Sequence, residues 1–189
     1  MAYKRIARYT PDVNVTRGVL QNNYFTIPNF ATFKGSSSVD SAETTIVNND
    51  KSTYKSSNVP NSNFTITFNN HSFKLSGVSL LSCYSSQCVY SFDIFGSNDG
   101  KAWNKECSVD KDVDYFKGAI RYADCASNKK YTNYRLMHRA GTYDNSLELY
   151  YLELFGDLFT RTNCVIMHTC KARVYNNILS LTHILLIIS

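Results

Sequence analysis

Cysteine and histidine are the side chains of this sequence best suited to hold a metal ion. Cys83 and Cys88 enclose a four-residue loop, and Cys164 and Cys170 enclose five residues that include His168. A structural zinc site usually joins two close pairs of ligands. The first spacing fits loosely and no second pair stands at a suitable distance, so we interpret these cysteines as loop or buried thiols. A disulfide between Cys83 and Cys88 stays open as an alternative if the chain is oxidised.

Nucleophilic catalysis is the second chemistry that these residue types could support. A catalytic serine or cysteine needs a base and an orienting group beside it. His71 lies in a polar turn, His138 ends a strand-like run, and the other two histidines lie in the C-terminal segment. No phosphate-binding loop or dinucleotide fingerprint occurs. The sequence therefore predicts that the protein is not an enzyme and acts by binding.

Composition narrows the class of partner. Hydrophobic residues make up 43% of the chain and aromatic residues 14%, which is typical of a folded globular protein. The net charge is +5, and the only adjacent basic pairs are Lys4-Arg5 and Lys129-Lys130, so no nucleic-acid partner is predicted. The first residues contain no apolar stretch typical of a secretory signal. We therefore expect a cytoplasmic protein whose six cysteines are thiols.

Short runs of alternating apolar and polar residues must position any binding side chains. The clearest is 63–68, where Phe64, Ile66 and Phe68 point one way and the threonines the other. The other runs expected to form strands are 43–47, 73–80, 89–95, 134–138 and 147–155. No window shows a long amphipathic helix. Many short strands joined by polar turns predict an all-β sandwich or barrel.

One segment carries a family resemblance. The sequence YSFDIFGSNDGKAW at 90–103 resembles the signature of the discoidin family, the coagulation factor V/VIII type C domains. There a strand runs into a Ser-x-Asp-Gly turn that a tryptophan follows. We expect Gly100 to take the positive-φ position of the turn and Trp103 to fold back onto the core. Other segments are also similar to the family and stand in the same order along the chain as in the family. They lie at 49–56, 64–68 and 73–82 before this signature, and at 131–137 and 152–156 after it.

The resemblance implies a fold and a division of the chain. The expected fold is an eight-stranded discoidin-like jelly-roll β-sandwich, also called galactose-binding-like, over residues 15–157. Residues 1–14 would form an extension and 158–189 an apolar tail. The disulfide that often joins the two ends of secreted members is absent, because no cysteine precedes Cys83 and Cys164 lies beyond Gly156. The tail could add a strand or helix, insert weakly in a membrane, or be a non-native extension.

The resemblance also implies where a ligand binds. In this architecture, loops at one end of the sandwich form the binding surface, and the ligand is a glycan or a protein surface. The residues expected at the loop tips are Tyr24, Phe25, Phe33, Tyr84 and Gln87. Ordinary packing in or beside the core is the alternative role for each of them.

Some sugar-binding members of the family hold a structural calcium ion. The matching positions here are Asn49, Asp50, Thr53 and Glu153. Because this set offers little negative charge, any calcium affinity should be modest. The alternative is that Asp50 caps a turn and Glu153 forms a surface pair. No other cofactor is predicted.

A peripheral membrane protein is the rival function. Exposed aromatic residues and the apolar tail would contact the lipid surface. The apolar run at 178–189 has twelve residues, whereas a membrane-spanning helix needs ~20. Membrane contact is therefore expected only at the surface, as the alternative to glycan or protein binding.

Overall fold

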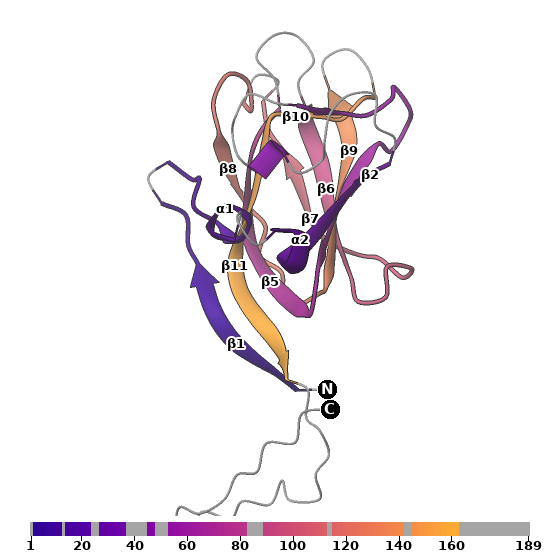
Figure 1. The fold of residues 1–189 in the computed structure, drawn as a ribbon. Helices are drawn as coiled ribbons and strands as arrows, with labels where there is room; N and C mark the ends of the chain where they lie inside the picture. The colour runs from indigo at the N-terminus through magenta and orange to yellow at the C-terminus, as the bar shows by residue number, and fades with distance from the viewer. Residues whose placement is uncertain are drawn as a thin grey trace, which may run out of the picture.

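The computed structural model of the chain contains two stacked antiparallel sheets (Figure 1). The prediction of an all-β sandwich is confirmed. The residues that the structure describes are 2–12, 14–23, 27–36, 45–47, 53–82, 89–112, 115–141 and 145–162.

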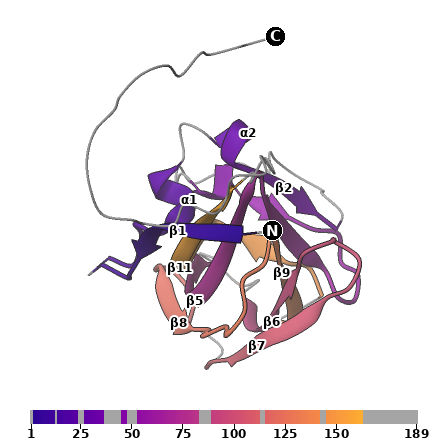
Figure 2. The ribbon, with the colours of Figure 1, turned by 90° about the horizontal axis from the view of Figure 1, so that it is seen from below.

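One sheet has four strands and the other has five. In spatial order, the four-stranded sheet contains β1 (Ala2–Tyr9), β11 (Tyr151–Thr162), β5 (His71–Leu81) and β8 (Arg121–Asp124). The five-stranded sheet contains β2 (Ala31–Gly35), β4 (Asn63–Phe68), β9 (Asn133–Gly141), β6 (Val89–Ser97) and β7 (Asn104–Asp110). Figure 2 shows the two layers from below, with β11, β5 and β8 on one side and β9, β6 and β7 on the other.

Smaller elements complete the described structure. The strands β3 (Tyr54–Lys55) and β10 (Glu148–Leu149) pair with each other. The helices are α1 (Val19–Asn22), α2 (Ile27–Phe30) and the 3-10 helix η2 (Thr45–Val47). No helix among the described residues has the length and apolarity required to cross a bilayer.

The core lies between the sheets and is rich in aromatic rings. Phe68 of β4 packs against Phe73 of β5 with ring centroids 5.5 Å apart. Tyr134 of β9 meets Phe73 edge-on at 6.2 Å, and its hydroxyl donates a hydrogen bond of 2.6 Å to the Phe73 carbonyl oxygen. Aromatic pairs of this kind add about 0.5–1.5 kcal/mol beyond the burial of their area. The two layers are therefore joined by ring packing and by a buried hydrogen bond.

The period-two pattern predicted the central strands correctly, but one short run was misread. Phe64, Ile66 and Phe68 of β4 are buried and the threonines between them are half-buried, as expected. The run at 43–47 is not a strand, because its described part, Thr45–Val47, forms η2. Ile46 and Val47 are both fully buried. An apolar pair this short fits a helical turn against the core as well as it fits a strand, so the pattern did not decide between them.

The first strand belongs to the same sheet as the last one. β1 pairs with β11 from Ala2 opposite Thr162 to Tyr9 opposite Gly156. The expected extension at 1–14 therefore contributes an edge strand, and β11 continues five residues beyond the expected domain limit at Asp157. The rest of the apolar tail, 163–189, lies outside the described residues.

A disulfide corrects the expectation that all six cysteines are thiols. Cys107 in β7 is bonded to Cys125, which directly follows β8, with the two Cα atoms 5.5 Å apart. The bond joins edge strands of opposite sheets. Beside it, Glu106 accepts hydrogen bonds from the hydroxyls of Ser127 at 2.6 Å and Tyr131 at 2.5 Å. This side of the sandwich is therefore closed covalently. The pair at Cys83 and Cys88 lies outside the described residues.

Candidate functional site

The outer face of the five-stranded sheet carries two parallel rows of polar side chains. In one row Lys34 of β2 lies opposite Thr65 of β4, which lies opposite Arg135 of β9. In the next row Thr32, Thr67 and Asn133 occupy the same three strands. These residues alternate with the buried ones, so the pleat that sends Phe64 and Ile66 into the core sends their neighbours outward.

Trp103 stands at one end of these rows, not in the core. The turn before it forms as predicted, with Gly100 at φ +69°. The Asp99 carboxylate accepts hydrogen bonds from the backbone N–H groups of Lys101 and Ala102, and these bonds hold its pKa below the usual range. The expectation that Trp103 folds back onto the core is wrong. Its ring lies 3.9 Å from the guanidinium carbon of Arg135, on the outer face of the sheet.

Arg135 is held in place on two sides. Its Nε donates a hydrogen bond of 3.2 Å to Thr65 Oγ1, while Trp103 covers it through a cation–π contact. The next row is also fixed, because Thr67 donates to Asn133 Oδ1 at 2.7 Å and the Asn133 amide donates to the Ser97 carbonyl at 3.1 Å. Partial burial lowers the pKa of Arg135, but an arginine stays charged in proteins.

The two rows and Trp103 line a cavity of about 480 Å³, which we call the sheet-face groove. This volume falls within the usual range for small-molecule sites. Its described lining residues offer hydroxyl, amide, ammonium, guanidinium and indole groups, and none of them is a carboxylate, histidine or cysteine. The lining residues are Thr32, Lys34, Gly35, Ser36, Asn63, Thr65, Thr67, Gly100, Trp103, Asn133 and Arg135. Such a lining can bind a polyhydroxylated ligand, but it holds no pair of groups suited to general acid–base catalysis.

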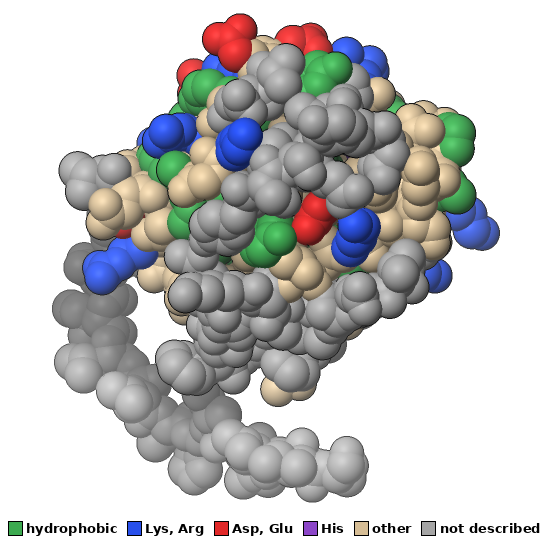
Figure 3. Space-filling view, turned by 90° about the horizontal axis from the view of Figure 1, so that it is seen from above, with side chains coloured by type: hydrophobic (Ala, Val, Ile, Leu, Met, Phe, Trp, Pro, Cys, Tyr) green, Lys and Arg blue, Asp and Glu red, His purple; other side chains and the backbone are tan. Residues whose placement is uncertain are grey.

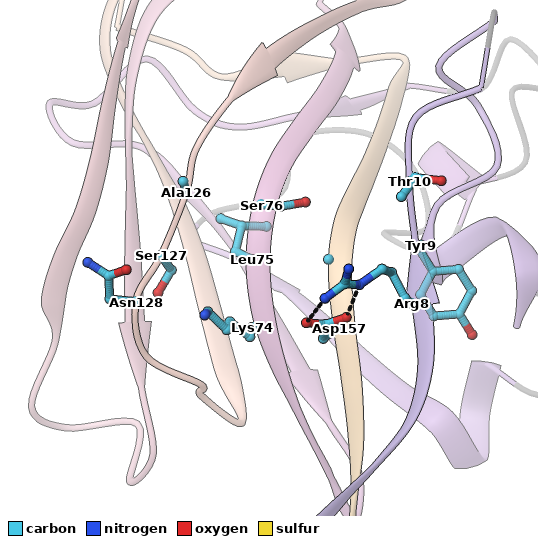
Figure 4. Close-up of a pocket in the computed structure, with 11 residues that line it drawn as sticks. Arg8, Tyr9, Thr10, Lys74, Leu75, Ser76, Ala126, Ser127, Asn128 and Asp157 are labelled. Atoms are coloured by element: carbon cyan, nitrogen blue, oxygen red, sulfur yellow. Dashed lines mark hydrogen bonds and ion pairs between the residues drawn. The ribbon is translucent and has the colours of Figure 1, made fainter.

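Two further hollows lie on and beside the four-stranded sheet. The first is a trough of about 370 Å³ over β5 (Figure 4). There Arg8 of β1 donates from Nε to Asp157 of β11 at 2.7 Å, and Arg5 lies 3.8 Å from the same carboxylate. The charges lining this trough are therefore partly satisfied by one another.

The second hollow, of about 510 Å³, adjoins the trough at Lys74 and also contains Lys129 and Lys130. The Lys130 ammonium lies 4.7 Å from the centre of the Phe159 ring. Flexible lysine side chains at an open surface position a ligand less firmly than a guanidinium held on two sides. The sheet-face groove is therefore the better-organised site.

The structure describes one of the five predicted loop-tip residues. Phe33 lies in β2, half-buried, with its ring stacked on Phe64 at 6.0 Å, which agrees with the packing alternative. Tyr24, Phe25, Tyr84 and Gln87 lie outside the described residues. Figure 3 looks onto the opposite end from the two termini, where described side chains of both charges are interspersed with hydrophobic ones.

Glu153 has a structural role that its sequence position did not reveal. Its side chain is fully buried, and its carboxylate accepts backbone N–H bonds from Leu20 at 2.7 Å, Gln21 at 2.6 Å and Leu154 at 2.8 Å. Burial raises the pKa of Glu153 to about 8, although these N–H groups act in the opposite direction. The expected surface pair for Glu153 is therefore wrong, because the carboxylate anchors α1 to β11.

The predicted calcium set is only partly described. Thr53 lies in the described part, whereas Asn49 and Asp50 lie outside it. Within the described ranges, no group of three or more histidine, cysteine or acidic side chains could hold a metal ion. The calcium site stays a prediction for the set as a whole.

Sequence reasoning missed the groove because its residues alternate with those that carried the fold prediction. Thr65, Thr67 and Arg135 were visible as the polar positions of two strand-like runs. A row across the sheet could have been inferred only from the pairing of β4 with β2 and β9, which no local pattern gives. Trp103 was recognised, but as a core residue.

Comparison with known proteins supports the fold. No protein-family model matches the chain. No curated protein matches it either. Among solved structures, the chain is similar to CpGH89CBM32-5 from Clostridium perfringens, in complex with GalNAc-β-1,3-galactose, with a TM-score of 0.59 and 13% identity over 74% of this chain and 100% of the other. It is also similar to the family 32 carbohydrate-binding module of NanJ from Clostridium perfringens, in complex with galactose, with a TM-score of 0.56 and 8% identity over 75% of this chain and 97% of the other.

A third similarity concerns a part of a larger protein. The Clostridium perfringens enzyme CpGH89, in complex with its substrate GlcNAc-α-1,4-galactose, matches with a TM-score of 0.53 and 16% identity. The match covers 70% of this chain but only 14% of the enzyme. At these identities the likeness concerns the fold. The chain has the galactose-binding-like β-sandwich of the family 32 carbohydrate-binding modules.

Proposed function

We propose that this protein is a non-catalytic recognition module of the discoidin-like type that binds a glycan. The observation that carries the proposal is the sheet-face groove, in which Trp103 and Arg135 border two rows of hydroxyl and amide groups. The fold supports it, because modules with this sandwich were solved with GalNAc-β-1,3-galactose and with galactose. Among the residues that the structure describes, the lining has no carboxylate, histidine or cysteine, which favours binding over catalysis.

The groove matches a sugar in shape and in hydrogen-bonding capacity. Neighbouring strands lie about 4.8 Å apart, so the row from Lys34 to Arg135 spans about 10 Å across the sheet. The threonine hydroxyls can donate and accept, and Asn133 offers both an amide N–H and a carbonyl oxygen. The indole of Trp103 supplies the apolar surface that ligand sites usually add to a few polar groups. A short oligosaccharide lying along the row would contact all of them.

The predicted binding loops at one end of the sandwich stay part of the proposal as an alternative location. A protein surface is the other ligand class that this kind of module can take, and no feature of the described residues favours it over a glycan. Membrane contact, the rival function, is not part of the proposal, because no observation supports it.

We also propose that the protein works in an oxidising compartment. The chain start led to the prediction of a cytoplasmic protein, whereas the bond between Cys107 and Cys125 favours an oxidising compartment, because structural disulfides are rare in the cytosol. Extracellular compartments are also where a glycan-binding module would meet most of its ligands.

The decisive experiment screens the purified full chain on a glycan array and then repeats the screen with Trp103→Ala. We expect binding to at least one class of glycan and its weakening by about thirtyfold or more in the variant, since truncating a central aromatic residue costs roughly 2 kcal/mol or more. Tyr90→Ala is the matched control, because Tyr90 is half-buried on β6 and does not line the groove.

Three results separate the possibilities. Binding that both variants retain would move the site from the groove to the predicted binding loops. An array without any signal, together with capture of the wild-type chain by a specific protein, would replace the glycan proposal by a protein ligand. Thermal unfolding of both variants shows whether the fold is intact.

A further inference from the structure

Arg135 differs from two other arginines on the sheet faces in having no acidic partner. Arg139 lies four residues after Arg135, on the same face of β9. It pairs with Asp93 at 2.9 Å and with Asp110 at 2.7 Å. Arg8 pairs with Asp157 at 2.7 Å. Among the described residues, no carboxylate forms an ion pair with Arg135, although its side chain is half-buried. A partly desolvated cation without a counter-charge is costly unless a ligand supplies the charge.

The guanidinium of Arg135 is also prepared to bind an anion. Trp103 covers one side of it and Thr65 accepts the hydrogen bond from its Nε. Its two terminal amino groups make no hydrogen bond to a described residue. A planar guanidinium whose orientation is already fixed is suited to a two-pronged hydrogen bond to a carboxylate or sulfate, because little side-chain entropy remains to be lost.

The surroundings of Arg135 reinforce the preference for negative charge. Lys34 lies in the same row, two strands away, and both cations border the cavity. No aspartate or glutamate is among the described lining residues, so the two cations favour a negatively charged ligand there. A neutral sugar would offer neither cation a counter-charge, whereas an acidic one would pair with at least one of them.

We infer that the sheet-face groove recognises an anionic sugar, one that carries a carboxylate or a sulfate group, with Arg135 as the residue that binds the anionic group. This inference rests on the proposed glycan-binding function and narrows it to a class of sugar. Thr65, Thr67 and Asn133 would bind the hydroxyl groups of the same chain.

The test measures binding of the full chain to four polymers by affinity gel electrophoresis. Polygalacturonate carries carboxylates and dextran sulfate carries sulfates, while galactan and unmodified dextran are their neutral counterparts. We expect the wild-type chain to bind one of the charged polymers better than its neutral counterpart, with the affinity falling as salt is added. Arg135→Gln should weaken this binding by about tenfold or more, since hydrogen bonds to charged groups contribute the most.

The matched control is Arg121→Gln, which removes the same charge from an exposed position on β8, in the other sheet. Its binding should stay within about twofold of the wild type, because a distant exposed charge is largely screened. Arg135→Lys keeps the charge but loses the planar two-pronged geometry, so its affinity should fall between those of the wild type and Arg135→Gln.

The outcomes separate this inference from the broader function. If Trp103→Ala abolishes binding of a neutral polymer while Arg135→Gln binds every polymer like the wild type, glycan binding stands and the anionic preference is overturned. Equal losses in Arg121→Gln and Arg135→Gln would also overturn it, because they would show nonspecific charge attraction. No binding to these polymers or to any glycan on the array overturns both proposals.

Discussion

Replacing Glu153 with glutamine tests how the buried carboxylate supports the fold. Its Oε1 accepts N–H groups from Leu20 and Leu154, and its Oε2 accepts one from Gln21. The amide of Glu153→Gln keeps one acceptor oxygen and turns the other position into a donor that faces a backbone N–H. Below its pKa of about 8 Glu153 is a neutral acid, whose hydroxyl oxygen can still accept an N–H bond, whereas the amide nitrogen cannot. With the amide oxygen in the better place, one buried donor therefore loses its partner, which costs about 1–3 kcal/mol.

The effect of this replacement on the free energy of unfolding depends on pH. The raised pKa of Glu153 determines whether the effect grows or shrinks as the pH rises. The pKa of Glu153 is about 8 in the fold against an ordinary value of 4.5, so the folded protein holds the proton more tightly than the unfolded chain does. The free energy of unfolding therefore has its full value below about pH 4.5 and falls as the pH rises towards 8, by up to about 5 kcal/mol. The glutamine variant has no such proton, so its stability lacks this decline.

Urea unfolding of both proteins at pH 5.5, 7 and 8.5 measures the difference. At pH 5.5 the variant should be less stable by about 1–3 kcal/mol, and at pH 8.5 the deficit should vanish or reverse. Glu148→Gln serves as the control, because the Glu148 carboxylate is half-buried and accepts a hydrogen bond from the Tyr150 hydroxyl. A deficit in Glu153→Gln that stays constant or grows with pH would refute the reasoning, since the backbone N–H groups would then outweigh burial.

Two further substitutions test the covalent and backbone constraints of the sandwich. The double replacement Cys107→Ser and Cys125→Ser should lower the free energy of unfolding by about 3 kcal/mol, the usual effect of a bridge of this sequence separation, which is 18 residues. Reductant should produce the same loss in the wild-type chain, and a urea midpoint unchanged by reductant would contradict the bridge. Gly156→Ala should destabilise the fold by about 1–3 kcal/mol from backbone strain alone, because Gly156 has φ +147°. Its new Cβ would also overlap the Lys74 carbonyl oxygen, so a chemical unfolding curve like that of the wild type would show that the irregular pairing of β11 with β5 at this point can relax.

The features that the sequence predicted are those that depend on near neighbours in the chain. The alternation of Phe64, Ile66 and Phe68 reports directly which face of β4 is buried, whatever strand lies beside it. The turn at Gly100 needs a positive φ that glycine supplies most easily. Together with the order of the strand-like runs, such local signals were sufficient for the all-β sandwich.

The features that escaped prediction depend on distant partners. Trp103 lies against Arg135, which is 32 positions later in the chain and reaches it only through the pairing of β6 with β9. The partner of Cys107 depends on how the two sheets meet at their edges. Glu153 looks like the polar residue of an alternating strand, and only the position of α1 explains its burial. Each of these side chains is defined by a contact with a residue that is distant in the chain.

The pairing of β1 with β11 determines how the module would respond to mechanical force. Ala2 lies opposite Thr162, so both ends of the described domain leave from the same corner (Figure 1). A pull on these two points would load the hydrogen bonds between the strands one pair at a time, as a zipper opens, because those bonds run perpendicular to antiparallel strands. The paired strands β1 and β11 would separate first, under modest tension. The loop closed by the bond between Cys107 and Cys125 could not extend at all.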